Sequence, residues 1–298
     1  MIVKEELSEF ISSLQISKYP SLDEFKRMGD MTALFYDEKQ RKFLDLNYER
    51  GQLLYLLITK LKPKNILEIG TAAGYGTLSM AWAMDDINLD GKIYTIDPIS
   101  NSTPISRAIN NHSGKGPEIK TISVNEIWEN VAKPEWLKKI IPVRGYSGEV
   151  LNKENFPKFD FIFIDGAHFF DGVKHDFFAS LNHANDDFSI LFDDYANRES
   201  YGIKRLIDED ISKKITVKMI KTDTKNNLEK IIDLKDKEYG MCFLQNNVED
   251  SNLLEIYSKK ERQKFISGYL KFEKRMKTRN QINKIFPSLK NKKLSFWR

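Results

Sequence analysis

The segment that most constrains the fold is residues 65–76, which read NILEIGTAAGYG. A short apolar run ends here at a glycine and is followed by a stretch with helical spacing from Thr77 to Met84. This pattern is typical of a buried strand that turns tightly into a helix, and glycines let the backbone turn and let a ligand approach it. In an open parallel sheet such a turn lies at the carboxyl edge of the strands, where ligands bind.

The rest of the chain continues this alternation of strands and helices. Helices are expected at residues 7–14, after a cap at Ser21, at 51–61, and at 124–140 with a break at Pro134. Further strands are expected at 92–97, 141–144, 159–165, 189–193, 215–220 and 239–244. Residues 101–121 are polar and contain Gly114 and Gly116, so they are expected to form a loop or lid.

These elements predict an α/β fold. We expect a Rossmann-like, seven-stranded, mostly parallel sheet with helices on both faces, in which the last two strands form an antiparallel pair at one edge. The chain is expected to divide into an N-terminal helical cap (1–45), a cofactor-binding core (46–248) and a basic helical tail (249–298).

Composition narrows the function classes. No apolar run is long enough to span a membrane, and the N-terminus lacks the apolar core of a secretory signal, so a cytoplasmic location is expected. The single cysteine, Cys242, excludes an internal disulfide and a cysteine-rich metal site. From Glu255 to Arg298 there are 14 Lys or Arg and 3 Asp or Glu, although the net charge of the whole chain is only +4. This tail could hold an anionic partner, but a solvated amphipathic helix is the simpler interpretation.

Polar residues follow several of the predicted strands. Asp97 ends the second strand, where a carboxylate can accept both hydroxyls of a ribose, so the glycine loop and Asp97 together predict an adenosine-containing cofactor. The glycine spacing, G-x-A-x-G-x-G after Glu68, departs from the G-x-G-x-x-G of dinucleotide-binding folds and argues against a nicotinamide cofactor.

Three carboxylates are predicted to converge near one histidine. Asp165 ends one strand, Asp193 and Asp194 end the next, and His168 follows Asp165 by three residues. Crowded carboxylates repel one another unless a cation or proton separates them, and a hard divalent ion such as Mg²⁺ would do so. The alternative for each aspartate is a cap on the following helix.

With these motifs, the chain from about Leu46 to Gln245 resembles the metal-dependent class I S-adenosylmethionine-dependent O-methyltransferases, in particular the branch of macrocin-type sugar O-methyltransferases. The resemblance rests on Asn47 to Leu54, on the glycine loop, on Ile164-Asp-Gly-Ala-His168 and on Phe192-Asp-Asp194. It departs from the family at Gly145-Tyr146-Ser147, where members often have Gly-Asp-Ser, so a carboxylate near the adenine is missing.

The resemblance implies roles for individual residues. His168 would be the general base, and Mg²⁺ would be held by Asp165, Asp193 and Asp194. The residues that would bind S-adenosylmethionine are Glu68, Gly70, Thr71, Ala72, Gly74, Gly76, Asp97, Ser147 and Asp165.

The sequence therefore predicts an S-adenosylmethionine-dependent, Mg²⁺-dependent O-methyltransferase that acts on a hydroxyl of a small molecule, either sugar-containing or another hydroxylated metabolite. Three alternatives stay open: a nucleic-acid methyltransferase that uses the basic tail, a non-methylating metal-dependent hydroxylase of the same fold, and a non-catalytic adenosine-binding scaffold. Nucleic acid is disfavoured as a partner because no separate RNA-binding motif is present. A homo-oligomer is not excluded, since the apolar face of the tail could pack on the core or on a second subunit.

Overall fold

The computed structural model describes residues 1–45, 47–112, 114–153, 155–197, 202–222, 239–246 and 252–285. One large sheet forms its centre, with the strand order β1-β11-β12-β10-β9-β4-β5-β8. The strands are β1 (Ile2–Glu6), β4 (Asn65–Ile69), β5 (Lys92–Asp97), β8 (Ile140–Arg144), β9 (Phe159–Ile164), β10 (Ala184–Ala196), β11 (Val217–Lys221) and β12 (Tyr239–Gln245). All neighbouring pairs are parallel except those that β12 makes with β10 and β11.

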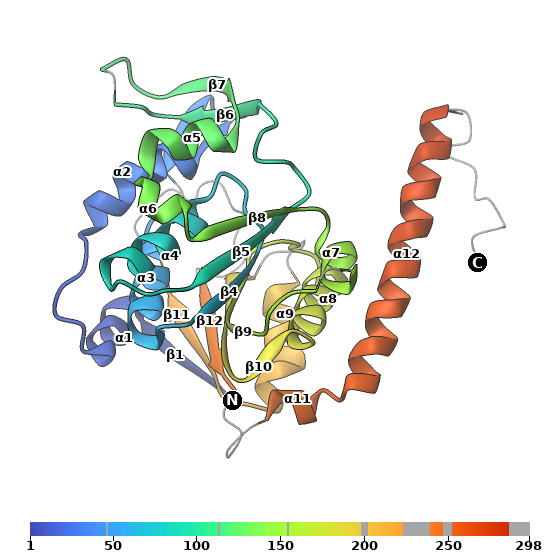
Figure 1. Ribbon diagram of the computed structural model, residues 1–298. Helices are drawn as coiled ribbons and strands as arrows, with labels where there is room; N and C mark the ends of the chain where they lie inside the picture. The colour runs from blue at the N-terminus through green and yellow to red at the C-terminus, as the bar shows by residue number, and fades with distance from the viewer. Residues whose placement is uncertain are drawn as a thin grey trace.

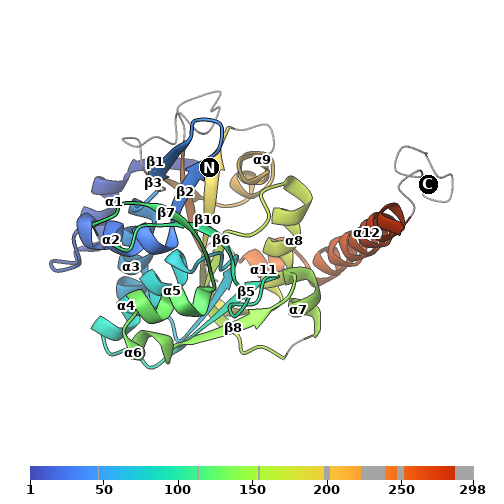
Figure 2. The ribbon, with the colours of Figure 1, turned by 90° about the horizontal axis from the view of Figure 1, so that it is seen from above.

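Helices cover both faces of this sheet (Figures 1 and 2). On one face lie α1 (Leu7–Leu14), α2 (Leu22–Thr32), α3 (Glu49–Leu61), α4 (Tyr75–Asp86), α5 (Val124–Val131) and α6 (Pro134–Leu137). On the other lie α7 (Ser147–Lys153), α8 (Phe170–Leu181), α9 (Ile203–Glu209), a short 3-10 helix (Ile211–Lys213), α11 (Leu253–Ile256) and the beginning of α12 (Lys259–Ile285). Each face has its own apolar core, and strands buried from both sides need near-continuous apolar sequence, as β9 shows with FDFIFI. The predicted α/β class and the mostly parallel sheet are confirmed.

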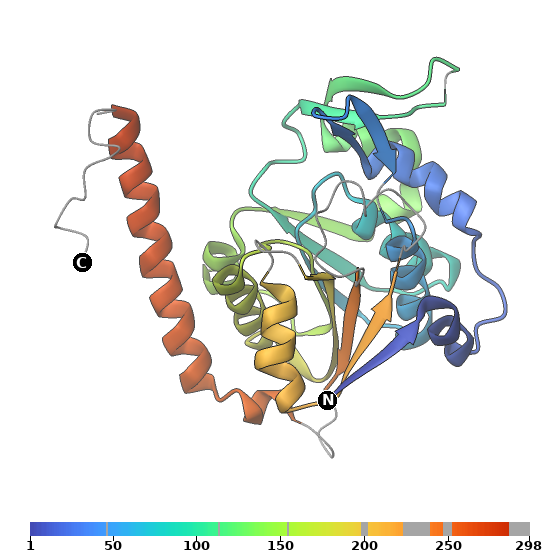
Figure 3. The same cartoon turned by 180° about the vertical axis from the view of Figure 1, so that it is seen from behind.

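The sheet has eight strands, one more than predicted. The extra strand is β1, which pairs in parallel with β11 and forms the edge of the sheet (Figure 3). Its sequence, IVKEE, has no apolar run because an edge strand is only half covered. The antiparallel pair β11–β12 is present as expected, but β1 lies outside it.

The expectation of a loop at residues 101–121 is wrong. This stretch contains β6 (Ile105–Ile109) and β7 (Glu118–Ile122), an antiparallel hairpin that pairs Arg107 with Lys120. A second hairpin, β2 (Leu34–Asp37) with β3 (Lys42–Asp45), lies in the part of the chain that was expected to be helical. Within the described residues, no helix is both long and apolar enough to cross a membrane.

Candidate active site

The register of the parallel strands brings the predicted functional residues to one edge of the sheet. Ile69 of β4 pairs with Ile96 of β5 and with Ile164 of β9, and Ile164 pairs with Phe192 of β10. The next residues along these four strands are Gly70, Asp97, Asp165 and Asp193. Strands β5 and β8 follow β4 on one side of the sheet, whereas β10 follows β9 on the other side, so the order of the strands reverses between β4 and β9. Open α/β sheets bind ligands at such a switch point.

Gly70 lets the loop after β4 pass close to the loop after β9. Its φ of +101° lies in the left-handed region, and a Cβ built on it would lie 2.1 Å from the carbonyl oxygen of Asp165. Gly74, with φ of +93°, caps the start of α4 against the indole of Trp128. Both positions therefore require glycine, and they leave the backbone of this loop open to a ligand.

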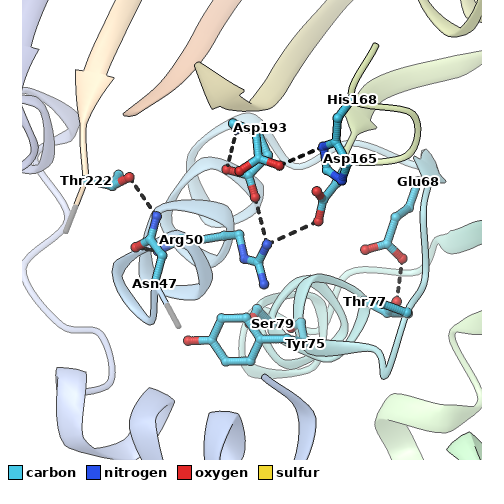
Figure 4. A network of polar contacts seen from close by, with 12 residues as sticks. Asn47, Arg50, Glu68, Tyr75, Thr77, Ser79, Asp165, His168, Asp193 and Thr222 are labelled. Carbon is cyan, nitrogen blue, oxygen red and sulfur yellow. Dashed lines mark hydrogen bonds and ion pairs between the residues drawn. The ribbon is translucent and has the colours of Figure 1, made fainter. Parts of the chain in front are cut away.

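Glu68 lies beneath the loop and is 1% exposed. Its carboxylate accepts a hydrogen bond from the hydroxyl of Thr77 on α4 (Figure 4) and another from the hydroxyl of Thr95 on β5. Burial raises the pKa of Glu68 to about 7, although both hydrogen bonds act in the opposite direction. Glu68 therefore joins strand to helix from behind the loop.

A cavity of about 570 Å³ opens above the ends of these strands. The predicted site residues that line it are Gly70, Ala72, Asp97, Ser147, Asp165 and His168. The remaining predicted cofactor residues, Glu68, Thr71, Gly74 and Gly76, are not among the residues that line it. A cavity of this size suits a cofactor-sized ligand.

Asp97 fixes the position of the loop that it faces. One carboxylate oxygen accepts the backbone N–H of Ala72 at 3.0 Å, and the other accepts the N–H of Ile99 at 2.8 Å. Asp97 therefore lines the cavity while its carboxylate is fixed by these two backbone bonds.

Two residues that sequence reasoning missed also line this cavity. The carboxylate of Asp176 on α8 accepts the hydroxyl hydrogen of Ser147 at 2.5 Å, and so a carboxylate lies beside Ser147 although Tyr146 stands where the family has aspartate. Arg107 on β6 donates to the carbonyl oxygen of Ala72 at 3.3 Å. Neither residue is near the glycine motif in sequence, and Arg107 lay in a stretch expected to be a loop.

The carboxylates of Asp165 and Asp193 meet at the guanidinium of Arg50 (Figure 4). The Nη1 atom of Arg50 lies 3.2 Å from Oδ2 of Asp165 and 2.7 Å from Oδ2 of Asp193. Arg50 extends from the first turn of α3, and its guanidinium carbon lies 5.4 Å from the ring centre of Tyr75. One cation is therefore shared by two buried carboxylates.

Asp194 has different partners from its neighbour. Its φ of +58° places it at an irregularity in the pairing of β10 with β12. Its Oδ2 lies 2.9 Å from Nδ1 of His168, and its Oδ1 accepts the hydroxyl hydrogen of Tyr239 at 2.8 Å. His168 is therefore positioned by a carboxylate, as a general base commonly is.

Burial and these contacts set the ionisation of the three aspartates. Burial raises the pKa of Asp165 well above its usual range, and the negative charge of Asp193 adds to this while Arg50 opposes it. Burial likewise raises the pKa of Asp193 against the effect of Arg50. Burial would also raise the pKa of Asp194, but the contacts with His168 and Tyr239 hold it below its usual range. Asp194 is thus the aspartate most firmly held in its ionised form.

The predicted Mg²⁺ site does not fit this arrangement. The structure brings Asp165, Asp193 and Asp194 together as predicted, but a guanidinium nitrogen lies between the first two, and both oxygens of the third have other partners. Among the described residues, no three His, Cys, Asp or Glu side chains are arranged to hold a metal ion.

Sequence reasoning did not assign a role to Arg50, although its position carried a signal. A cation in the first turn of a helix lies at the positive end of the helix dipole, which is unfavourable unless an anion lies nearby. An arginine in the first turn of α3 therefore suited an acidic partner outside the helix, although Glu49 lies in the same turn.

A family model described as a methyltransferase domain matches residues 67–195. Caffeoyl-CoA O-methyltransferase 5 of Nicotiana tabacum is 28% identical over 166 residues, which cover 55% of this chain and 59% of that protein. The caffeoyl-CoA O-methyltransferase of Petroselinum crispum is also 28% identical and is covered over 58% of its length. The matched segment thus spans less than two thirds of these relatives.

Solved structures with a similar fold include a putative O-methyltransferase from Klebsiella pneumoniae, with 19% identity and a TM-score of 0.49. A second is the O-methyltransferase TomG from Streptomyces achromogenes in complex with SAM, with 18% identity and the same TM-score. Each match covers 80% of this chain and 94% of the other. Residues 67–195 of this chain therefore match a methyltransferase domain, and the chain is similar over part of its length to caffeoyl-CoA O-methyltransferases.

Proposed function

We propose that this protein transfers a methyl group from S-adenosylmethionine to a hydroxyl oxygen of a small molecule. The observation that carries the proposal is that one cavity is lined both by the glycine loop with Asp97 and by the pair Asp165 and His168. Gly70, Ala72 and Asp97 line one part of it, and Asp165 and His168 line another. A cofactor held by the first group would therefore present its reacting end near the second.

The residues of the loop fit the cofactor. The absent Cβ of Gly70 leaves the backbone accessible, and Asp97 is held where it can accept ribose hydroxyls. Ser147 and Asp176 form a polar pair that suits the adenine end. When bound, S-adenosylmethionine supplies a methyl group on a positively charged sulfur, which is reactive towards an oxygen nucleophile.

His168 is the proposed general base. The contact of its Nδ1 with Asp194 favours the tautomer that carries the proton on Nδ1, so Nε2 is the basic nitrogen. The proton of the acceptor hydroxyl would pass to Nε2 as the oxygen bonds to the methyl carbon and the bond from that carbon to sulfur breaks. Tyr239 holds the carboxylate of Asp194 from its other side, so the histidine is oriented before the acceptor binds.

The acceptor is proposed to be a small hydroxylated molecule. Caffeoyl-CoA, for which the relatives above are named, belongs in a first screen beside sugar-containing alcohols and simple catechols. A metal ion enters no step here, because the predicted ligands are already engaged with Arg50, His168 and Tyr239. We also propose a reducing compartment such as the cytoplasm, since the only cysteine, Cys242, is buried as a thiol.

Calorimetric titration of S-adenosylmethionine into the full chain tests the cofactor half of this proposal. We expect saturable binding, with affinity lowered about tenfold or more by Asp97→Ala because the loop anchor and the ribose acceptor are lost together. Asp90→Ala, at an exposed aspartate that precedes β5, is the matched control and should bind like the parent protein. Absence of binding to the parent protein would refute the proposal.

Turnover separates the remaining alternatives. Release of S-adenosylhomocysteine with any acceptor of the screen supports methyl transfer. His168 is supported as the base if His168→Gln strongly lowers this release but retains cofactor binding. Cofactor binding without turnover on any acceptor would favour the non-catalytic scaffold. Iron that co-purifies with the protein in stoichiometric amount would favour the hydroxylase.

A further inference from the structure

We propose that the guanidinium of Arg50 is the resident cation of this active site and takes the place of the divalent ion predicted between Asp165 and Asp193. The inference deepens the proposed function and rests on it for its catalytic meaning. Its physical content is independent of the methyl-transfer reaction, because it concerns which cation the two carboxylates bind.

The position of the guanidinium is the first argument. A divalent ion shared by Asp165 and Asp193 would have to lie between their facing oxygens, within about 2.0–2.6 Å of each. The Nη1 atom of Arg50 lies between the same oxygens, at 3.2 and 2.7 Å, which are hydrogen-bond distances. An ion and this nitrogen cannot occupy that place together.

The second argument is that several contacts hold Arg50 in this position. Its own backbone N–H donates to Oδ1 of Asn47, and the amide nitrogen of Asn47 donates to the hydroxyl of Thr222 at 2.7 Å. The ring of Tyr75 lies beside the guanidinium, and its hydroxyl donates to the carbonyl oxygen of Tyr48 at 2.7 Å (Figure 4). A side chain supported from α3, α4 and the end of β11 belongs to the built site, unlike an arginine free to swing on the surface.

The third argument concerns the remaining predicted ligand. The left-handed backbone of Asp194 accompanies a carboxylate whose two oxygens contact His168 and Tyr239. Only Asp165 and Asp193 then face the central cation, and the second of these also accepts the N–H of Asp194 on its other oxygen. The third predicted ligand, Asp194, is thus engaged with other partners and does not face the cation.

Arg50 therefore gives the site a positive charge that does not depend on the concentration of free metal. Its single positive charge offsets one of the two negative charges of the carboxylate pair, and proton removal is left to His168 and Asp194. A lysine would not be equivalent, because the flat, permanently charged guanidinium can face two carboxylates at once with defined geometry.

Titration of Mn²⁺, followed by its electron paramagnetic resonance signal in the cofactor-free full chain, tests the inference. The parent protein should show no saturable binding at sub-millimolar Mn²⁺. In Arg50→Met the two carboxylates lose their cation, so Mn²⁺ should bind about tenfold or more tightly than to the parent. Arg50→Met combined with Asp193→Asn should lose this binding again.

Arg205→Met is the matched control, because Arg205 forms an exposed ion pair with Glu209 and does not line the cavity, and it should behave like the parent protein. Circular dichroism shows whether Arg50→Met folds. If this variant does not fold, the Mn²⁺ titration of the parent protein still tests the inference. Stoichiometric Mn²⁺ binding to the parent, abolished by Asp193→Asn, would overturn the inference, and so would a folded Arg50→Met that binds Mn²⁺ no better than the parent. A failure of the proposed function would appear separately, as missing cofactor binding.

Discussion

At the scale of single residues, this site stabilises four buried or partly buried carboxyl groups in different ways. Asp165 and Asp193 share the positive charge of Arg50. Asp194 is held by His168 and Tyr239, whereas Glu68 has two hydroxyl donors and no cation in contact. An isolated buried carboxylate is costly, and hydroxyl donors compensate less than a cation does. The burial of Glu68 should therefore be visible in the stability of the protein.

The free energy of unfolding should fall between about pH 4.5 and pH 7 because of Glu68. Its pKa is about 7 in the folded chain and 4.5 ordinarily, so both states are protonated below pH 4.5 and the unfolded chain ionises first as pH rises. The loss is complete above pH 7 and is on the order of 3 kcal/mol. Arg50 and Asp97, the charged groups that also act on Glu68, oppose each other in this effect.

Urea unfolding across this pH range checks the prediction. Glu68→Gln keeps an oxygen for the two threonine hydroxyls but does not titrate, so its unfolding free energy should fall less between pH 4.5 and 7 than that of the parent. Glu129→Gln, at an exposed position on α5, should leave the pH dependence unchanged. Equal slopes for Glu68→Gln and the parent would show that Glu68 is not the group responsible.

At the scale of elements, the strands that are buried on both faces could be predicted from the sequence, whereas the edge strand and the exposed hairpin could not. Strands β4 and β9 have apolar runs that only a two-sided core explains, and the residue that ends each was correctly placed at one edge. Strand β1 and the hairpin β6–β7 have charged or polar sequences, because β1 forms the sheet edge and β7 is mostly exposed. The role of Arg50 depends on its contacts with Asp165 and Asp193, more than 100 residues away in the chain, and such long-range contacts leave little trace in local sequence.

The hairpin should matter for the cofactor through Arg107. This side chain lines the cavity, contacts the loop at Ala72 and is half-buried, and burial lowers its pKa although Asp97 opposes this. A guanidinium held over the cofactor loop is suited to an anionic or hydroxyl group of the ligand. Arg107→Met should therefore weaken binding of S-adenosylhomocysteine, measured by calorimetry, by about tenfold.

Lys120→Met is the matched control for this measurement, because Lys120 is the cross-strand partner of Arg107 on the same hairpin and is exposed. It should leave the affinity unchanged. If the two variants bound the product equally well, the hairpin would be a structural cover with no part in cofactor recognition.

At the scale of the whole molecule, the basic tail is joined to the catalytic core. Helix α12 contacts α8 and α7, and its C-terminal part projects away from the core (Figures 1 and 3). Its Ile266 is fully buried, and Arg262 donates through Nε to Asn182 at 2.9 Å, so at least one basic residue of the tail is structural. The ring of Tyr269 lies 4.5 Å from that of His175 and also lines the cavity. Residues 286–298, which hold the rest of the basic tail, lie outside the described residues.

The tail should therefore contribute to both stability and cofactor binding. Ile266→Ala removes apolar volume from a buried site and should destabilise the protein by about 2–4 kcal/mol. Truncation after Asn247 also removes Tyr257, Arg262 and Tyr269, so it should lower the midpoint of thermal unfolding further and weaken the binding of S-adenosylmethionine. Lys271→Ala, at an exposed position of the same helix, should change neither property. If the tail were solvated and served only to attract nucleic acid, the truncated protein would keep its stability and its cofactor affinity. It would instead lose a salt-sensitive affinity for RNA or DNA.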